Sequence, residues 1–162
     1  MPDALVTSNA SIHLSVRCAL ALAGLLGEVR PSWELAAGRL RHVLDEHPEA
    51  FEPKPNSMDW YYPVLGGALP TEQARDRLDE RWDEFVLGSM GVRCVSTNAW
   101  VTGAETCELV LALDAVGRRD AAIAALADMQ HLRDPDGSYW TGFELDADLL
   151  WPVERTTWTG AT

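Results

Sequence analysis

The sequence lacks any long hydrophobic run, which excludes a membrane-spanning helix. Its most apolar stretch, Cys18 to Leu26, is nine residues long and lies between Arg17 and Glu28, whereas a spanning helix needs about 20 apolar residues. The first ten residues also lack the basic-then-apolar order of a signal peptide. We therefore expect no membrane span and no secretion signal.

Lysine and cysteine are both scarce. Lys54 is the only lysine, and 13 basic residues face 25 acidic ones, for a formal net charge of -12. Such a charge repels nucleic acid and anionic lipid surfaces, so no nucleic-acid partner is expected. Cys18, Cys94 and Cys107 are odd in number and form no CxxC pair, which is typical of reduced thiols in a cytoplasmic protein.

Motifs for metal binding and for nucleophilic catalysis are absent as well. Asp134 to Gly137 begins like a calcium loop, but Tyr139 and Leu145 stand where such a loop needs glycine and glutamate. There is no GxSxG, no glycine-rich phosphate loop and no cysteine paired with histidine at a suitable spacing. We expect no metal site and can name no cofactor. An enzyme of this composition would work by general acid and base or by stabilising a cation.

Helical periodicity runs through almost the whole chain, and no alternating strand pattern extends beyond a few residues. The sequence therefore predicts an all-α fold. Apolar inner helices are expected at Ser11 to Leu26 and Thr97 to Val116, each ending at a glycine (Gly27 and Gly117) that can adopt a left-handed conformation. A third inner helix is expected at Met58 to Leu69.

Amphipathic segments follow these inner helices. They are Ser32 to His47, Thr71 to Leu87, with Thr71 as a candidate N-cap, and Ala121 to Leu132. Alternation of apolar and amphipathic helices predicts stacked helical hairpins, either an open solenoid or a closed ring. A fourth inner helix is expected to start near Arg155. Residues 1–162 would then form one segment of about three hairpins, completed by self-association or by a partner domain.

The segments that lead into the inner helices combine aromatic residues with carboxylates and one arginine. In a ring of hairpins they would meet at one mouth, where aromatics suit the face of a sugar or the cationic centres of an isoprenoid. The candidate catalytic residues are Asp59, Glu105 and Glu154, and the candidate substrate-binding residues are Trp60, Tyr61, Arg93 and Trp140.

Several of these candidate residues also have a purely structural explanation. Asp59 is also explained as an acid in the first turn of its helix, where the dipole favours it. Glu105 is either an inward functional acid or the buried partner of Arg93. Tyr61 and Tyr62 are adjacent, so we expect at most one of them to face a pocket.

Several segments resemble the α/α-toroid proteins of the terpenoid cyclase and prenyltransferase type, in their C-terminal half. Residues 130–140 resemble the glutamine-to-tryptophan repeat of that family, and the likeness extends over 5–12, 58–65, 91–95, 100–105 and 139–142. The resemblance implies a ring of six hairpins, of which this chain would supply about half. The cyclases' aspartate motif, the prenyltransferases' zinc set and the aspartate-rich magnesium motifs are absent.

Three functional hypotheses follow from these residues and the resemblance. The leading one is a prenyltransferase-like or cyclase-like protein that acts on an isoprenoid, with a small-molecule or lipid-like substrate. The alternative is a carbohydrate-active toroid, of glycoside hydrolase or lyase type, that uses carboxylates and stacked aromatics. The third is a non-catalytic binding subunit.

Overall fold

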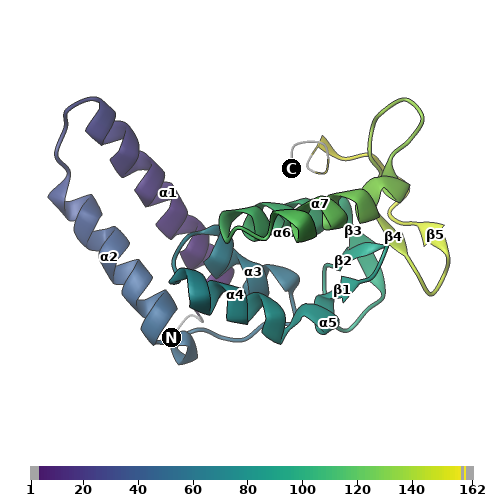
Figure 1. The fold of residues 1–162 in the computed structure, drawn as a ribbon, viewed down its shortest axis with the longest axis horizontal. Helices are drawn as coiled ribbons and strands as arrows, with labels where there is room; N and C mark the ends of the chain where they lie inside the picture. Colours follow the sequence, from purple (N-terminus) through teal and green to yellow (C-terminus); the bar gives the residue numbers. More distant parts are fainter. Residues whose placement is uncertain (1–3, 158, 160–162) are drawn as a thin grey trace.

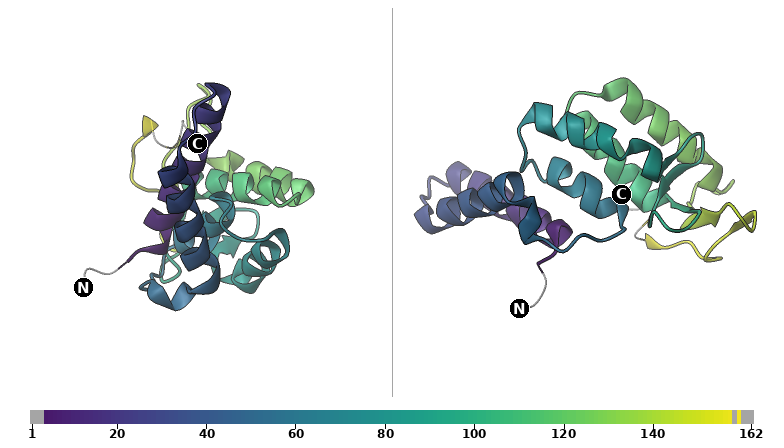
Figure 2. Two further views of the ribbon diagram at one scale, coloured as in Figure 1. Left: turned by 90° about the vertical axis from the view of Figure 1, so that its left-hand side faces the viewer. Right: turned by 90° about the horizontal axis from the view of Figure 1, so that it is seen from below.

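A computed structural model describes residues 4–157 and 159, which form an elongated molecule with a helical hairpin at one end and a small β-sheet at the other (Figure 1). The hairpin consists of α1 (Val6–Leu25) and α2 (Pro31–Glu46). The view from below shows it extending away from the rest of the chain (Figure 2, right).

The helices α1 and α6 are followed by short turns at the two glycines where helix ends were expected. Gly27 and Gly117 adopt positive φ angles of 70° and 76°. The next amides, of Glu28 and Arg118, donate hydrogen bonds back to the carbonyls of Ala23 and Leu113, which is the pattern that closes helices through a left-handed residue. The predicted turns at these two glycines are confirmed.

The central body packs α3 (Ser57–Leu65), α4 (Thr71–Glu80) and α5 (Trp82–Phe85) against α6 (Gly103–Ala115) and α7 (Arg119–Asp128). Two 3-10 turns, Pro48–Ala50 and Met129–Leu132, follow α2 and α7. The core between these helices contains the fully buried side chains of Trp60, Leu78, Phe85, Leu109 and Leu113.

A five-stranded antiparallel sheet lies at the far end from the α1–α2 hairpin (Figure 1). Its strands are β1 (Val86–Leu87), β2 (Gly91–Arg93), β3 (Trp100–Thr102), β4 (Gly142–Glu144) and β5 (Leu149–Leu150), in that spatial order. The chain leaves the sheet after β3 to form α6 and α7, and β4 then pairs with β3. The N-terminus of α6 is therefore fixed directly at the sheet.

The sheet shows that the all-α prediction is wrong. Each strand has only two or three residues, which is too short for a period of two to stand out from helical periodicity. The inner helix expected from Thr97 begins only at Gly103, because Trp100 to Thr102 form β3 and Thr102 is extended (φ -132°, ψ 150°). With a sheet at one end, the chain is a small helix-and-sheet fold and not part of an all-helical toroid.

The segment predicted as the first buried inner helix is also largely exposed. In α1 only Ala10, His13 and Ala23 are buried, while Leu22 and Leu25 are 63% and 84% exposed. No helix among the described residues has the length and apolar character needed to cross a membrane.

Two further expectations concern the helix ends. Pro70 is the N-cap of α4, so Thr71 is its first helical residue and not the cap. The fourth inner helix expected from Arg155 runs over residues 158 and 160–162, which lie outside the described part of the chain.

Candidate functional site

Glu105 lies in the first turn of α6, where the helix leaves β3. Thr102 and Glu105 have the spacing of a capping box, in which the two side chains bind each other's backbone amides. Here the Thr102 side chain caps no amide. Its hydroxyl instead donates to Oε2 of Glu105. The carboxylate is half-buried, and Thr102, 2% exposed, fixes its orientation.

Glu108 lies one helical turn further along α6 and accepts hydrogen bonds from two tyrosines of α3. The Tyr61 hydroxyl donates to Oε2 at 2.6 Å, and the Tyr62 hydroxyl donates to Oε1 at 2.8 Å. Both phenols therefore point at the same carboxylate. Tyr61 does so from within the buried core, and of the two only Tyr62 lines a surface cavity in the described part of the chain, which agrees with the expectation that at most one of them faces a pocket. Residues three apart share a helix face, so Glu105 and Glu108 form one acidic pair.

Burial sets the protonation behaviour of Glu108 and of the two phenols. Desolvation raises the pKa of Glu108, and the charge of Glu105 raises it further, while the bonds from both tyrosines oppose the rise. Burial also raises the pKa values of Tyr61 and Tyr62, and the nearby charge of Glu108 adds to both. The two phenols therefore remain protonated donors over the whole physiological pH range.

Cys94 is the remaining polar member of the cluster. It follows β2, and its amide donates to the carbonyl of Trp100 at 3.2 Å, which places it opposite β3. Burial, together with the adjacent Glu105, raises the pKa of the Cys94 thiol to about 12. A thiol of this kind is protonated and a poor nucleophile at neutral pH.

Asp59 lies in the first turn of α3 and is bonded to a different set of residues. It is 6% exposed and accepts hydrogen bonds from the Thr7 hydroxyl at 2.5 Å and from the Lys54 amide at 3.1 Å. The adjacent cavity, about 130 Å³, is lined by residues of α1, α2, α4 and the segment before α3. These contacts tie the N-terminal hairpin to α3, and none of them involves Glu105 or Glu108.

Trp60 is fully buried in the core. Its indole stacks on Phe85 with ring centroids 5.4 Å apart, and its N–H donates to the carbonyl of Arg77 at 2.7 Å. With both the ring and the N–H engaged, Trp60 presents no surface to a ligand. Tyr61, by contrast, lies in the acidic cluster through its bond to Glu108.

The remaining three candidates have their contacts with residues outside the cluster. Arg93 donates to the carbonyl of Ser96 at 3.0 Å and makes no ion pair with Glu105 among the described residues, so the structure does not support the alternative of a buried Glu105–Arg93 pair. The guanidinium of Arg155 covers the ring of Trp140 at 4.5 Å from its centroid. Glu154 is exposed, and its backbone carbonyl accepts a bond from the amide of Thr141.

Sequence reasoning found Glu105 and Tyr61 but missed Glu108, Thr102, Tyr62 and Cys94 as members of one cluster. The available signal was the three-residue spacing of two glutamates on an otherwise apolar helix face. Within residues 4–157 and 159, no group of three or more histidine, cysteine or acidic side chains is arranged to hold a metal ion. What the cluster offers is one half-exposed carboxyl, fixed by a hydroxyl, with a buried carboxyl and two phenols behind it.

Comparison with known proteins gives a clear relative. No family model matches the chain. The MMP endo-(1,4)-3-O-methyl-alpha-D-mannosidase of Mycolicibacterium hassiacum is 60% identical over 160 residues, which cover 98% of this chain and 45% of that protein. The chain thus spans less than half the length of the curated relative it matches.

This similarity overturns the prenyltransferase interpretation. A likeness over nearly the entire chain to a mannosidase leaves no support for the resemblance to terpenoid cyclases and prenyltransferases, for the leading isoprenoid function or for a lipid-like substrate. The aromatic-rich segments that carried the resemblance are short and occur in core and loop positions alike. Of the sequence hypotheses, the carbohydrate-active alternative is the one that the comparison favours.

Proposed function

We propose that this chain carries an acid site for cleaving α-linked chains of 3-O-methylated mannose, and that Glu105 is the carboxyl that transfers the proton. The similarity to the mannosidase over 98% of the chain supports the substrate class. The observation that carries the assignment within the structure is the Glu105–Glu108 pair, held between Thr102 and the two tyrosines.

Hydrolysis of a glycosidic bond needs a carboxyl group that protonates the departing oxygen while positive charge develops on the sugar ring. A water molecule then bonds to the anomeric carbon and gives a proton back to the carboxylate. Glu105 fits this role because its half-buried side chain remains accessible and the Thr102 hydroxyl holds it in one orientation. Preorganisation of this kind matters because small displacements of a proton donor lower the rate steeply.

Glu108 acts in this proposal as a positioning residue. Only 7% of it is exposed, and each of its oxygens accepts a phenol hydrogen bond, so it does not touch the substrate. It fixes Tyr61 and Tyr62 against α6 and places a second acidic group one helical turn behind Glu105. The electrostatic surroundings of Glu105 thus depend on the protonation state of Glu108.

The test is cleavage of an α-1,4-linked oligosaccharide of 3-O-methylmannose by the full chain, followed through the appearance of new reducing ends. The Glu105→Gln variant should lose at least about 100-fold in rate with its thermal midpoint nearly unchanged. Glu34→Gln is the matched control, because Glu34 is an exposed residue of α2 and should retain full activity. Absence of cleavage by the wild-type chain, or full activity of Glu105→Gln, would refute the proposal.

A further inference from the structure

One face of the sheet continues from the acid site toward β5. Side chains alternate along a strand, and directly paired residues of neighbouring strands share a face. Trp100 and Thr102 are two residues apart on β3, Trp100 pairs with Glu144 of β4, and Glu144 pairs with Leu149 of β5. These side chains therefore lie on the same face as Thr102, which holds Glu105.

Trp151 extends this face by one more aromatic ring. Its amide donates to the carbonyl of Gly142 at 3.0 Å, and the Trp100 N–H donates to the Trp151 carbonyl at 2.7 Å. The two indoles meet edge to face with centroids 5.3 Å apart. We call Trp100, Glu144, Leu149 and Trp151 the aromatic face.

Gly142 makes room for this arrangement. A Cβ atom at Gly142 would lie 2.6 Å from Nε1 and 3.1 Å from Cε2 of Trp100, so the indole of Trp100 lies directly across the glycine backbone. With its ring on the glycine and its N–H bonded, Trp100 is held in place. Trp151 is 53% exposed and Leu149 is 44% exposed, so rigid apolar surface faces the solvent here.

We propose that the aromatic face binds the sugar units next to the one cleaved at Glu105; this inference rests on the proposed function. Two residues of extended strand separate Trp100 from Thr102, about 6.6 Å, so a sugar chain bound at Glu105 would reach the indoles within a few units. Continuity with Glu105 through Thr102 is what distinguishes this surface from other exposed apolar residues.

The chemistry of the face suits a neutral, partly methylated glycan. Indole rings bind flat apolar surfaces while leaving polar edges to solvent, and a sugar ring presents such a surface through its C–H groups. Methyl ethers add apolar area that Leu149 can contact. Glu144 is bonded through its backbone in the sheet, but its side chain makes no hydrogen bond or ion pair within the described residues and can accept bonds from sugar hydroxyls. A chain of net charge -12 would repel an anionic glycan.

The test measures affinity as a function of oligosaccharide length. Calorimetric titration uses α-1,4 oligosaccharides of 3-O-methylmannose of increasing length, with each variant made in the full chain that also carries Glu105→Gln, so that no ligand is cleaved. Trp151→Ala should weaken binding of the longer oligosaccharides about tenfold and leave the shortest bound ligand unaffected. Trp151→Phe should restore most of the affinity.

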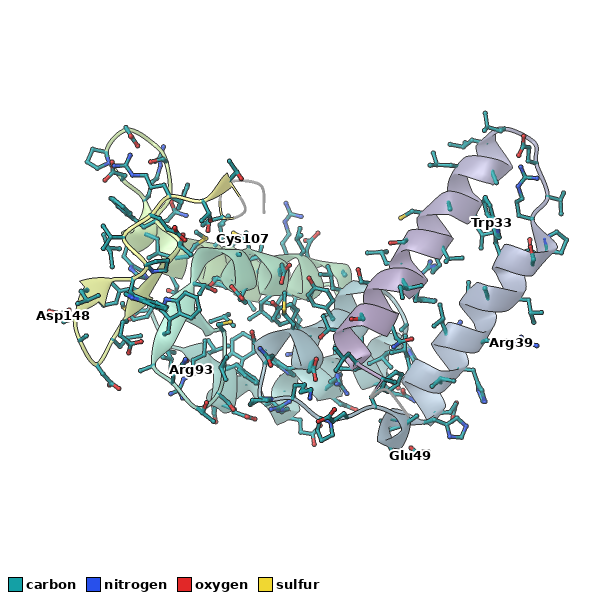
Figure 3. The ribbon with its side chains drawn as sticks, turned by 180° about the vertical axis from the view of Figure 1, so that it is seen from behind. Trp33, Arg39, Glu49, Arg93, Cys107 and Asp148 are labelled. Atoms are coloured by element: carbon teal, nitrogen blue, oxygen red, sulfur yellow. The ribbon has the colours of Figure 1, made fainter. Side chains whose placement is uncertain are left out.

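Trp33→Ala is the matched control. Trp33 is a 40% exposed tryptophan on α2, and Figure 3 shows it on the hairpin, far from Arg93 and Asp148 at the sheet end. The proposal that the aromatic face binds sugar would be contradicted if Trp151→Ala and its parent had equal affinities at every length. It would also be contradicted if Trp33→Ala lost as much affinity as Trp151→Ala. If binding depends on Trp151 but the wild-type chain cleaves none of the oligosaccharides, the proposed function is wrong and the aromatic face is still a sugar-binding surface.

Discussion

Replacing Tyr61 with phenylalanine removes one hydroxyl from the buried pair of phenols that bind Glu108. Tyr61 is fully buried, and its hydroxyl donates to Glu108 at 2.6 Å. Water cannot easily replace this donor, so one oxygen of a buried carboxyl is left without a partner. Hydrogen bonds to charged groups contribute about 1.5–3 kcal/mol, and we expect Tyr61→Phe to lower the free energy of unfolding by that amount.

Tyr62→Phe supplies the matched comparison. It removes a bond of similar length to the other oxygen of Glu108, but Tyr62 is only partly buried, so solvent can take the place of the lost hydroxyl. Its loss should be about 1 kcal/mol or less. Urea unfolding followed by circular dichroism at 222 nm measures both values. The reasoning would be refuted by an unchanged stability of Tyr61→Phe or by a larger loss in Tyr62→Phe.

Tyr61→Phe and Glu108→Gln together test a dependence of stability on pH whose sign follows from the raised pKa of Glu108. The folded-state pKa of Glu108 is raised, so the folded protein binds more protons than the unfolded chain between the two pKa values. Its contribution to stability is therefore greatest below the unfolded pKa, near 4.5, and declines as the pH rises toward the folded pKa. Tyr61→Phe removes a bond that opposes this rise and should steepen the decline, whereas Glu108→Gln should remove it.

Two further predictions probe the surroundings of Glu105. Burial and the charge of Glu105 raise the pKa of the Cys94 thiol, so iodoacetamide should modify Cys94 far more slowly than the exposed Cys18. Glu105→Gln should speed the reaction at Cys94. Equal rates at the two cysteines would contradict the cluster. Gly142→Ala should destabilise the fold by about 1–3 kcal/mol, because its methyl group would lie 2.5 Å from the Val101 carbonyl oxygen. Gly38→Ala, a helical position with no atom within 4 Å of the new methyl group, should instead be neutral or stabilising, and a similar loss in both variants would contradict the packing at Gly142.

The helices could be predicted from the sequence because their signals are local. The apolar stripe of α2 and the glycines that end α1 and α6 depend on residues within a few positions of one another. The sheet could not be predicted in this way. Its strands are two or three residues long, and β4 pairs with β3 across the whole of α6 and α7, so its stability comes from contacts that no local pattern reveals.

In the candidate site, too, some residues could be identified from local sequence and others only from long-range contacts. Glu105 could be identified because a carboxylate near the start of an apolar helix is conspicuous. Trp60 looked equally suitable as a ligand contact, and only the packing of Phe85 and the carbonyl of Arg77 around it show that it belongs to the core. Tyr61 and Tyr62 converge on Glu108 because α3 packs across α6, an arrangement that neighbouring positions in the sequence do not specify.

A crystal structure of the Glu105→Gln chain with a 3-O-methylmannose oligosaccharide tests the central claim most directly. We expect a glycosidic oxygen within about 2.6–3.2 Å, hydrogen-bond reach, of the side chain at position 105, with further sugar units lying along Trp100 and Trp151. An oligosaccharide bound in the cavity beside Asp59, or along the α1–α2 hairpin with the acidic pair left empty, would contradict it.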